Sequence, residues 1–310
     1  MDLRNYVLRR LFLAIPTILG VITIVFFLSH IIPGDPVDFI VGDQASSLDR
    51  ADLIQQLGLD KPLPTQYKNY LVRLFHGDLG TSYYTQGKKV FSLILERLPA
   101  TILLAFSSLF LALLISIPLG VLSAVKAFSK IDTFAMMLAL LGISIPNFAL
   151  GPLLISIFAV WMNLPFPISG MEGLLSLILP TITLGTALTA ILTRMLRTSL
   201  LDVLSQDYIR TAYAKGLYSK TILYKHALRN ALNPVITITG LQLGTLLTGA
   251  IITEKIFDWP GLGQLFIGAI QQRDFLVIQG CVLIISLTYI FINLITDLFY
   301  SVVDPTISLK

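Results

Sequence analysis

Residues 99–125 read PATILLAFSSLFLALLISIPLGVLSAV and contain no Asp, Glu, Lys or Arg. A helix needs about 20 apolar residues to cross the hydrocarbon core of a bilayer, and this stretch is long enough. Its apolar residues are continuous and do not alternate with polar ones, which favours a helix over a strand of a membrane barrel. The stretch therefore predicts a membrane-spanning helix.

Five further apolar runs lie on both sides of this stretch. They cover residues 11–32, 134–162, 174–193, 231–253 and 276–296. The first run is longer than the 7–15 residues of a signal-peptide core and has no small-residue cleavage site, so we interpret it as a retained span. We expect an all-α polytopic membrane protein with six transmembrane helices.

The composition points to the same class of protein. Of the 310 residues, 55% are hydrophobic and 13% are charged, whereas soluble domains average about 45–50% and about 25%. A cytosolic globular protein is excluded, and so is a disordered chain, because disordered chains are poor in apolar residues. The only cysteine is Cys281, which excludes an internal disulfide and a multi-cysteine metal cluster.

The distribution of Lys and Arg predicts the orientation in the bilayer. Residues 1–10, the turn after residue 125 and residues 194–230 hold most of them, whereas the short loops on the other side hold only Lys255 and Arg273. Since short cytoplasmic loops are enriched in Lys and Arg, we place both termini in the cytoplasm. The segments are then an N-terminus (1–10), a first helix (11–32), an external domain (33–98), a membrane core (99–298) and a tail (299–310).

Three short helices are expected in the small external domain. Asp49 can cap the first, which ends at Leu57, and Thr65 begins the second. Residues 90–98 form the third and lead into Pro99. No catalytic group is visible in this domain.

Residues 194–230 predict a basic helical hairpin on the cytoplasmic side. Asp207 or Ser205 opens a helix that Gly216 ends, Ser219 begins a second helix, and Asn233-Pro234 marks the start of the fifth span. Two functions fit this hairpin on physical grounds, namely docking of another protein and contact with anionic lipid. The residues that would allow close approach of a protein are Thr211, Ala212, Ala214 and Gly216.

Small and hydroxyl residues repeat at helical spacing inside two spans. The stripes are Thr181, Gly185, Thr189 and Thr193, and Thr237, Gly240, Gly244 and Thr248. Stripes of this kind let helices pack closely. A water-filled pathway for a solute would be lined by the same types of residue. The candidate pathway residues are Asn147, Thr189, Gln242 and Thr245. Pro118 and Pro146 predict kinks in their helices.

Residues 254–263 connect the fifth and sixth spans. Pro260 and Gly261 signal a turn, and Phe257 and Trp259 suit the headgroup level of the bilayer. The loop is either a re-entrant connector or an outer gate. The candidate gate residues are Glu254, Pro260, Gly261 and Gly263.

Groups that would supply energy or catalysis are missing from the sequence. No span has a carboxylate or Lys near its centre, which disfavours ion-coupled transport. No phosphate-binding loop of the form G-x-x-x-x-G-K-[ST] and no hydrolase or metal motif occurs. We expect no bound cofactor, no metal and no nucleic acid, and uphill transport would need energy from another chain.

At the hairpin the sequence resembles the membrane permeases of binding-protein-dependent ABC importers. The match to their cytoplasmic EAA loop covers residues 208–216, residues 226–231 and Pro234, with Arg210 where the general pattern has Glu. The subfamily it resembles most imports dipeptides, oligopeptides, glutathione and nickel. Further matching motifs follow in order at residues 34–36, 57–60, 77–80, 98–101, 144–148, 254–263 and 304–305.

The resemblance implies a type I ABC importer permease in a bacterial or archaeal cytoplasmic membrane. The chain would form half of a pathway for di- or oligopeptides or glutathione, with a nickel or metal-chelate importer, a passive channel and a membrane scaffold as alternatives. Its partners would be a second homologous permease, two cytoplasmic ATPases that bind ATP and Mg, and an external solute-binding protein. The residues expected to couple to the ATPases are Tyr208, Arg210, Thr211, Ala212, Lys215 and Gly216.

Overall fold

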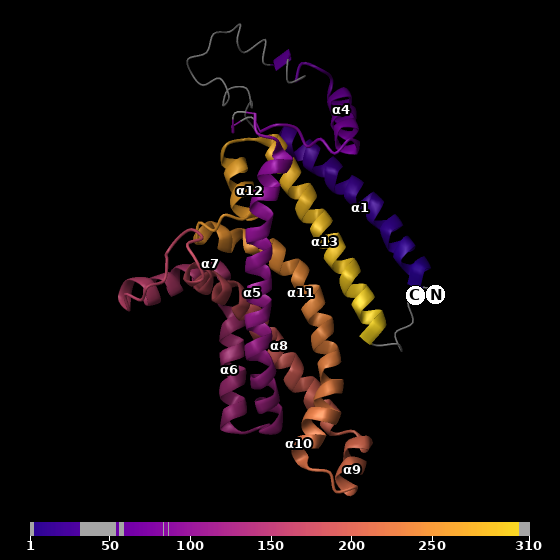
Figure 1. Cartoon of the computed structure of the whole chain (residues 1–310), viewed down its shortest axis with the longest axis vertical. Coiled ribbons are helices and arrows are strands. Elements are labelled where there is room, and N and C mark those ends of the chain that lie inside the picture. Colours follow the sequence, from indigo (N-terminus) through magenta and orange to yellow (C-terminus); the bar gives the residue numbers. More distant parts are fainter. Residues whose placement is uncertain (1–2, 32–53, 56–58, 83, 86, 304–310) are drawn as a thin grey trace. The chain divides into compact units, whose positions relative to one another are not determined.

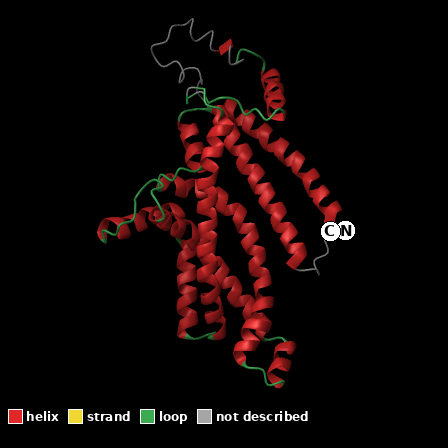
Figure 2. Cartoon of the chain, viewed as in Figure 1, coloured by secondary structure: helices red, strands yellow, loops and turns green. Residues whose placement is uncertain are grey.

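The computed structural model describes residues 3–31, 54–55, 59–82, 84–85 and 87–303 (Figure 1). Within these residues the regular structure is helical, with one isolated bridge between Thr81 and Lys89 (Figure 2). The chain divides into two compact units. The first unit comprises residues 1–7, 102–259 and 291–310, and the second comprises residues 8–101 and 260–290.

The first unit is a bundle of long helices. Its elements are α5 (Val90–Val125, from residue 102), α6 (Lys130–Ser144), α7 (Asn147–Leu154), η1 (Ile155–Trp161), α8 (Leu175–Leu204), α9 (Asp207–Ala214), α10 (Ser219–Thr221), η2 (Ile222–Ala227), α11 (Leu228–Ile256) and the end of α13 (Phe275–Val303). The elements η1 and η2 are π-helices. Helix α8 packs against both α6 and α11.

Small residues set the closest helix contacts in this bundle. A Cβ atom at Gly185 of α8 would lie 3.0 Å from the backbone oxygen of Ser108 in α5. A Cβ at Gly240 of α11 would overlap Thr296 of α13. These two glycines belong to the two predicted stripes, and at these positions the stripes pack helices together.

The third predicted span is two helices rather than one. Helix α6 ends at Ser144, and α7 with η1 continues at 104° to it after a break. Pro146 disfavours helical backbone at the preceding residue, and Ile145 accordingly adopts extended angles of φ −87° and ψ 115°. Five described helices are long and apolar enough to cross a membrane, or six when this bent pair counts as one span.

Two expected helix boundaries are wrong. Residues 90–98 are not a separate helix, because α5 continues from Val90 through Pro99 and Pro118. The helix that contains the fifth span does not begin at Asn233-Pro234, because α10, η2 and α11 form one continuous helix from Ser219 to Ile256. A helix several turns long retains most of its hydrogen bonds when a proline removes one of them.

In the second unit, helix α4 (Leu63–Phe75) packs on α1 (Leu3–Ile31) through aromatic side chains. Phe26 of α1 lies 5.2 Å from Tyr67 and 5.6 Å from Tyr70, measured between ring centroids. Burial raises the pKa of Tyr70 to about 12. Helix α4 begins two residues before the expected Thr65, after Pro62. The helix expected over residues 49–57 lies largely outside the described residues.

A buried carboxylate organises the other half of this unit. Asp274 accepts a hydrogen bond of 2.5 Å from the Ser82 hydroxyl, and its other oxygen accepts one of 3.3 Å from the Val277 amide at the start of α13. Helix α12 (Leu262–Gln271) begins where the Leu262 amide donates to Thr101 at 2.8 Å. The side chain of Cys281 is buried in the adjoining apolar core.

Candidate functional site

The hairpin predicted to couple to a partner is α9 joined to α10 and η2 by a tight turn. Gly216 has φ +75°, which favours glycine, and two hydrogen bonds close the turn. The Leu217 amide donates to Ala212 at 3.3 Å, and the Gly216 amide donates to Tyr213 at 2.9 Å. This is the Schellman arrangement of a helix C-terminus. The predicted role of Gly216 in ending the first helix is confirmed.

The interior of the hairpin is apolar and tightly closed. Ile209 and Ala212 of α9 are buried, as are Ile222 and Ala227 of η2. Ala212 is therefore packed within its own chain, unlike Thr211 and Gly216, which are exposed. A larger side chain at Ala212 would disturb the hairpin itself before it could affect a partner.

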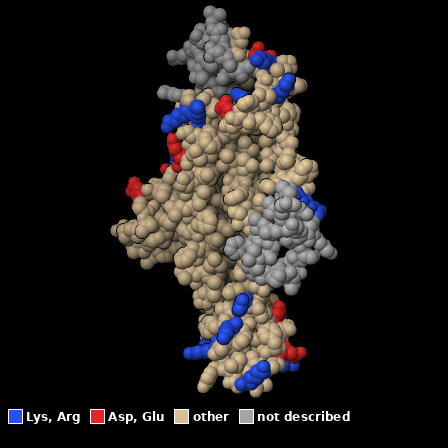
Figure 3. Space-filling view, turned by 45° about the vertical axis from the view of Figure 1, so that its right-hand side comes forward, with Lys and Arg blue, Asp and Glu red and all other residues tan. Residues whose placement is uncertain are grey.

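Cations and aromatic rings share the exposed surface of the hairpin. The exposed cations are Arg210, Lys215, Lys220, Lys225 and Arg229. The exposed fractions of the tyrosines are 43% for Tyr208, 52% for Tyr213, 84% for Tyr218 and 61% for Tyr224. In Figure 3 blue side chains gather at the lower end of the view, with red ones beside them at the right, and the centre of the view above them is largely tan.

Polar contacts hold some of the predicted coupling residues in place. The Tyr208 hydroxyl accepts a 2.9 Å hydrogen bond from the side chain of Asn230, which joins α9 to α11. The Thr211 hydroxyl donates to the Asp207 carbonyl at 3.0 Å. Arg210 lies 3.5 Å from Asp207, and this exposed ion pair contributes little stability. Lys215 is exposed at the end of α9, so its charge is available to a partner.

The four candidate pathway residues do not form one polar site. Gln242 and Thr245 are bonded to each other on α11, with 2.6 Å between the hydroxyl and the amide oxygen. Asn147 is the first residue of α7, just after the bend. Thr189 lies on α8 and faces a different environment, a cavity between α5, α6 and α8.

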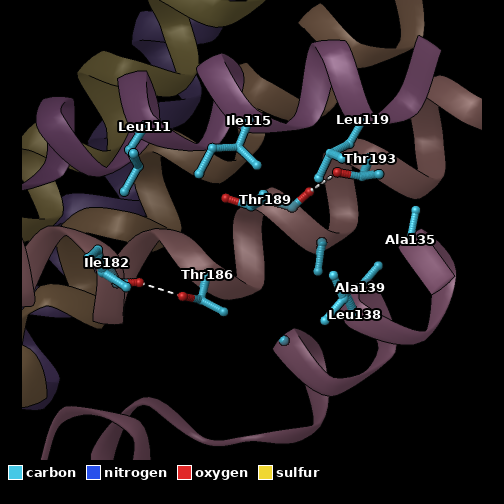
Figure 4. A pocket seen from close by; sticks show the side chains of 12 residues that line it. Leu111, Ile115, Leu119, Ala135, Leu138, Ala139, Ile182, Thr186, Thr189 and Thr193 are labelled. Carbon is cyan, nitrogen blue, oxygen red and sulfur yellow. Dashed lines mark hydrogen bonds between the residues drawn. The ribbon is translucent and has the colours of Figure 1, made fainter. Parts of the chain in front are cut away.

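This cavity has a volume of about 390 Å³ and an apolar lining (Figure 4). Its hydroxyl groups are satisfied within α8, because Thr186, Thr189 and Thr193 each donate to the carbonyl four residues earlier, at 2.5, 2.8 and 2.7 Å. Such bonds leave the lining without free donors. The cavity therefore has the character of a packing void between helices rather than of a polar solute site.

The candidate gate residues belong partly to each unit. In the first unit, Glu254 is fully buried near the end of α11, and its carbonyl accepts from the Trp259 amide at 2.8 Å. In the second unit, Gly261 precedes α12 and Gly263 is buried within it, while Pro260 is half-buried. Phe257 and Trp259 are also buried, so their rings contact protein rather than lipid headgroups, and the position of this loop at the headgroup level stays a prediction. Large rings in an apolar interior gain more from protein contacts than from a wet interface.

Sequence reasoning missed two features of the first unit. Tyr218 and Tyr224 were not among the coupling candidates, although aromatic residues within a basic, otherwise polar loop are a signal for an exposed contact surface. The second feature is an ion pair between Asp132 and Arg197, which are 65 residues apart. No local pattern pairs them. No group of three His, Cys, Asp or Glu side chains suited to a metal occurs in the described residues.

Comparisons with known proteins cover nearly the whole chain. Residues 116–309 match the family described as binding-protein-dependent transport system inner membrane component, and residues 3–105 match the family of its N-terminal part. The chain is 43% identical over 309 residues to the glutathione transport system permease protein GsiC of Salmonella typhimurium. It is 43% identical over 338 residues to the dipeptide transport system permease protein DppB of Escherichia coli. Each alignment covers 99% of both proteins.

Solved structures of chains from ABC transporters have the same fold. A chain of the MetNI methionine ABC transporter in an inward-facing conformation matches with a TM-score of 0.56 and 18% identity, covering 69% of this chain and 97% of that one. A chain of an amino acid ABC transporter matches with a TM-score of 0.54 and 14% identity, covering 68% and 94%. The predicted fold class, an all-helical importer permease, is confirmed.

Proposed function

Because the chain belongs to the family of binding-protein-dependent transport system inner membrane components, we propose that it forms half of the translocation pathway of an ATP-driven peptide importer. The relatives at 43% identity are named for glutathione and dipeptide transport, which favours a peptide over nickel or a metal chelate. A second, homologous permease would supply the other half of the pathway. An external binding protein would deliver the peptide, and two cytoplasmic ATPases would bind ATP and Mg.

The observation that carries the coupling role is the length of the helix that bears the hairpin. Residues 219–256 form one continuous helix, of which 231–253 is the predicted span. The twelve residues from 219 to 230 therefore extend the helix by about 18 Å on the cytoplasmic side. A headgroup layer is only about 5–8 Å thick.

The hairpin would thus project beyond the lipid headgroups into water. Its exposed tyrosines and lysines lie at the end of this projection, where they can reach a soluble protein. A hairpin resting on anionic lipid would instead lie flat, within the interface. Docking of an ATPase is therefore favoured over lipid contact as the function of this surface.

In the proposed cycle, closure of the ATPase pair on ATP displaces the hairpin. The displacement moves the spans as rigid bodies between inward-open and outward-open states. Tyr208, Arg210, Thr211, Lys215 and Gly216 are proposed to form the docked surface or its turn, and Ala212 to support it from within. Asn147, Thr189, Gln242 and Thr245 stay candidate pathway residues, and Glu254, Pro260, Gly261 and Gly263 stay candidates for the outer gate.

Co-purification and uptake test this proposal. The permease pair, extracted in mild detergent, is expected to retain its ATPases, and proteoliposomes of the full complex are expected to import glutathione or a dipeptide only with ATP. The double variant K215E/K220E should release the ATPases while membrane insertion is unchanged. K126E, on an exposed lysine of the α5–α6 turn, is the matched control. ATP-independent flux through the permeases alone would instead identify a passive channel.

A further inference from the structure

An ion pair between buried Asp132 and partly buried Arg197 joins α6 to α8 in the first unit. The Arg197 guanidinium donates from Nε to one oxygen of Asp132 and from Nη2 to the other, each at 2.6 Å. Asp132 is only 3% exposed. Two parallel bonds between planar groups fix both the distance and the relative orientation of the two helices.

The same carboxylate also fixes the turn between α5 and α6. The amide of Phe128 donates to Asp132 at 2.8 Å, and Phe128 has φ +62°, an unfavourable value for a bulky residue. Its ring is 90% exposed and lies 5.9 Å from the Arg197 guanidinium. Such a strained, exposed residue persists only where its surroundings determine its conformation. One carboxylate thus connects the α5–α6 turn, the first turn of α6 and the C-terminal third of α8.

The ion pair lies between the hairpin and the apolar cavity. Arg197 precedes the end of α8 at Leu204 by two helical turns, about 10 Å along the axis. The cavity begins about one helical turn from the ion pair, on the side away from the hairpin. The lining residues nearest to the ion pair in sequence are Ala135 of α6 and Thr193 of α8. The ion pair therefore fixes α6 to α8 near the hairpin, and the cavity between α5, α6 and α8 adjoins it on the side away from the hairpin.

We propose that Asp132 and Arg197 are positioning residues that pass displacement of the hairpin from α8 to α5 and α6. This inference rests on the proposed ATPase-coupling role of the hairpin. A buried ion pair is a poor source of stability compared with apolar packing, so its value here is a defined geometry. The adjoining cavity leaves room for side chains of α5, α6 and α8 to rearrange while Asp132 and Arg197 move together.

Conservative variants in the complete transporter separate coupling from folding. R197K keeps the charge but loses the bidentate geometry, and D132N keeps the shape but loses the charge. R194K, on an exposed arginine of the same helix, is the matched control. Each variant is assembled with its partner permease, ATPases and binding protein in proteoliposomes. The measurements are the amount of complex, the ATPase rate, and the uptake of radiolabelled glutathione and alanyl-alanine.

We expect R197K and D132N to assemble and hydrolyse ATP, while uptake per ATP falls by about 5- to 150-fold, the usual range for lost coupling between sites. R194K should match the parent. Uptake per ATP at the parental level in both variants would overturn the proposal. So would failure of both variants to assemble, because the pair would then be structural only. If the parental complex itself shows no ATP-driven uptake, the proposed function fails instead.

A rescue experiment adds a result that a structural role would not give. In a background with Cys281 replaced by Ala, D132C/R197C is treated with a bifunctional thiol reagent that spans the former ion pair. Cross-linking is expected to restore uptake per ATP by at least half of what the unlinked double variant lost. If uptake per ATP stays at the level of the unlinked double variant after complete cross-linking, the link between α6 and α8 does not transmit the displacement. A monofunctional reagent of the same chemistry serves as the control.

Discussion

The turn at Gly216 makes a quantitative prediction about docking. Its φ of +75° disfavours any residue with a Cβ, and no atom lies within 4 Å of where that Cβ would be. The effect of Gly216→Ala is therefore confined to the backbone and amounts to about 1–2 kcal/mol. That energy corresponds to a factor of about 5–30 in an equilibrium constant.

Because docking must restore the left-handed turn that the substitution disfavours in the free permease, the Kd of the ATPase for the permease pair is expected to rise by up to about 5–30-fold. Gly216→Asn should have a smaller effect, since Asn tolerates left-handed backbone, and Gly216→Val a larger one. The assay is a titration of the purified ATPase onto permease pairs held in nanodiscs. Stability of the permeases in the same nanodiscs is followed in parallel.

A matched control lies in the loop before α8. Gly170 has φ +78° and equally open surroundings, so Gly170→Ala carries the same backbone penalty away from the hairpin. It should leave the Kd unchanged. An unchanged Kd for Gly216→Val, or an equal loss for Gly170→Ala, would refute the argument that this turn positions a docking surface.

Three further substitutions test packing seen in the structure. Ala212→Leu overfills the hairpin interior and should lower stability by about 1–3 kcal/mol, visible as faster proteolysis at the hairpin. Gly240→Ala should lower the Tm in detergent, because the new Cβ overlaps Thr296. Thr296→Ala in the same chain should recover most of the lost stability. If the effects of the two substitutions simply add, the two residues are not in contact. Ser82→Ala removes a donor from buried Asp274 and should cost about 1–3 kcal/mol, measured by denaturation of the purified protein, whereas an unchanged midpoint would mean that another donor replaces it.

The features that sequence could predict are those set by local chemistry. Long charge-free runs identified the spanning helices, because burial in lipid demands both apolar side chains and complete backbone pairing. Gly216 identified the end of α9, because a left-handed turn there favours glycine. Both inferences depend on properties of one segment at a time.

The features that sequence could not predict depend on competition between segments. Pro146 breaks a predicted span, whereas Pro118 and Pro234 lie inside continuous helices. The positions of the prolines alone do not show where packing by neighbouring helices keeps the helix continuous. The inward orientation of Ala212 depends on packing against η2, and the pairing of Asp132 with Arg197 on the approach of α6 to α8. Contacts of this kind follow from tertiary structure rather than from spacing.

The unbroken helix from Ser219 to Ile256 has a mechanical consequence. A flexible linker would absorb a push at the hairpin, but a helix of about 57 Å behaves as a lever arm. If it pivots at one end, a tilt of about 10° moves the other by about 10 Å. The displacement of the far end is then set by the length of the helix and the position of the pivot. A short glycine insertion near residue 230 would reduce this displacement without changing either end of the helix.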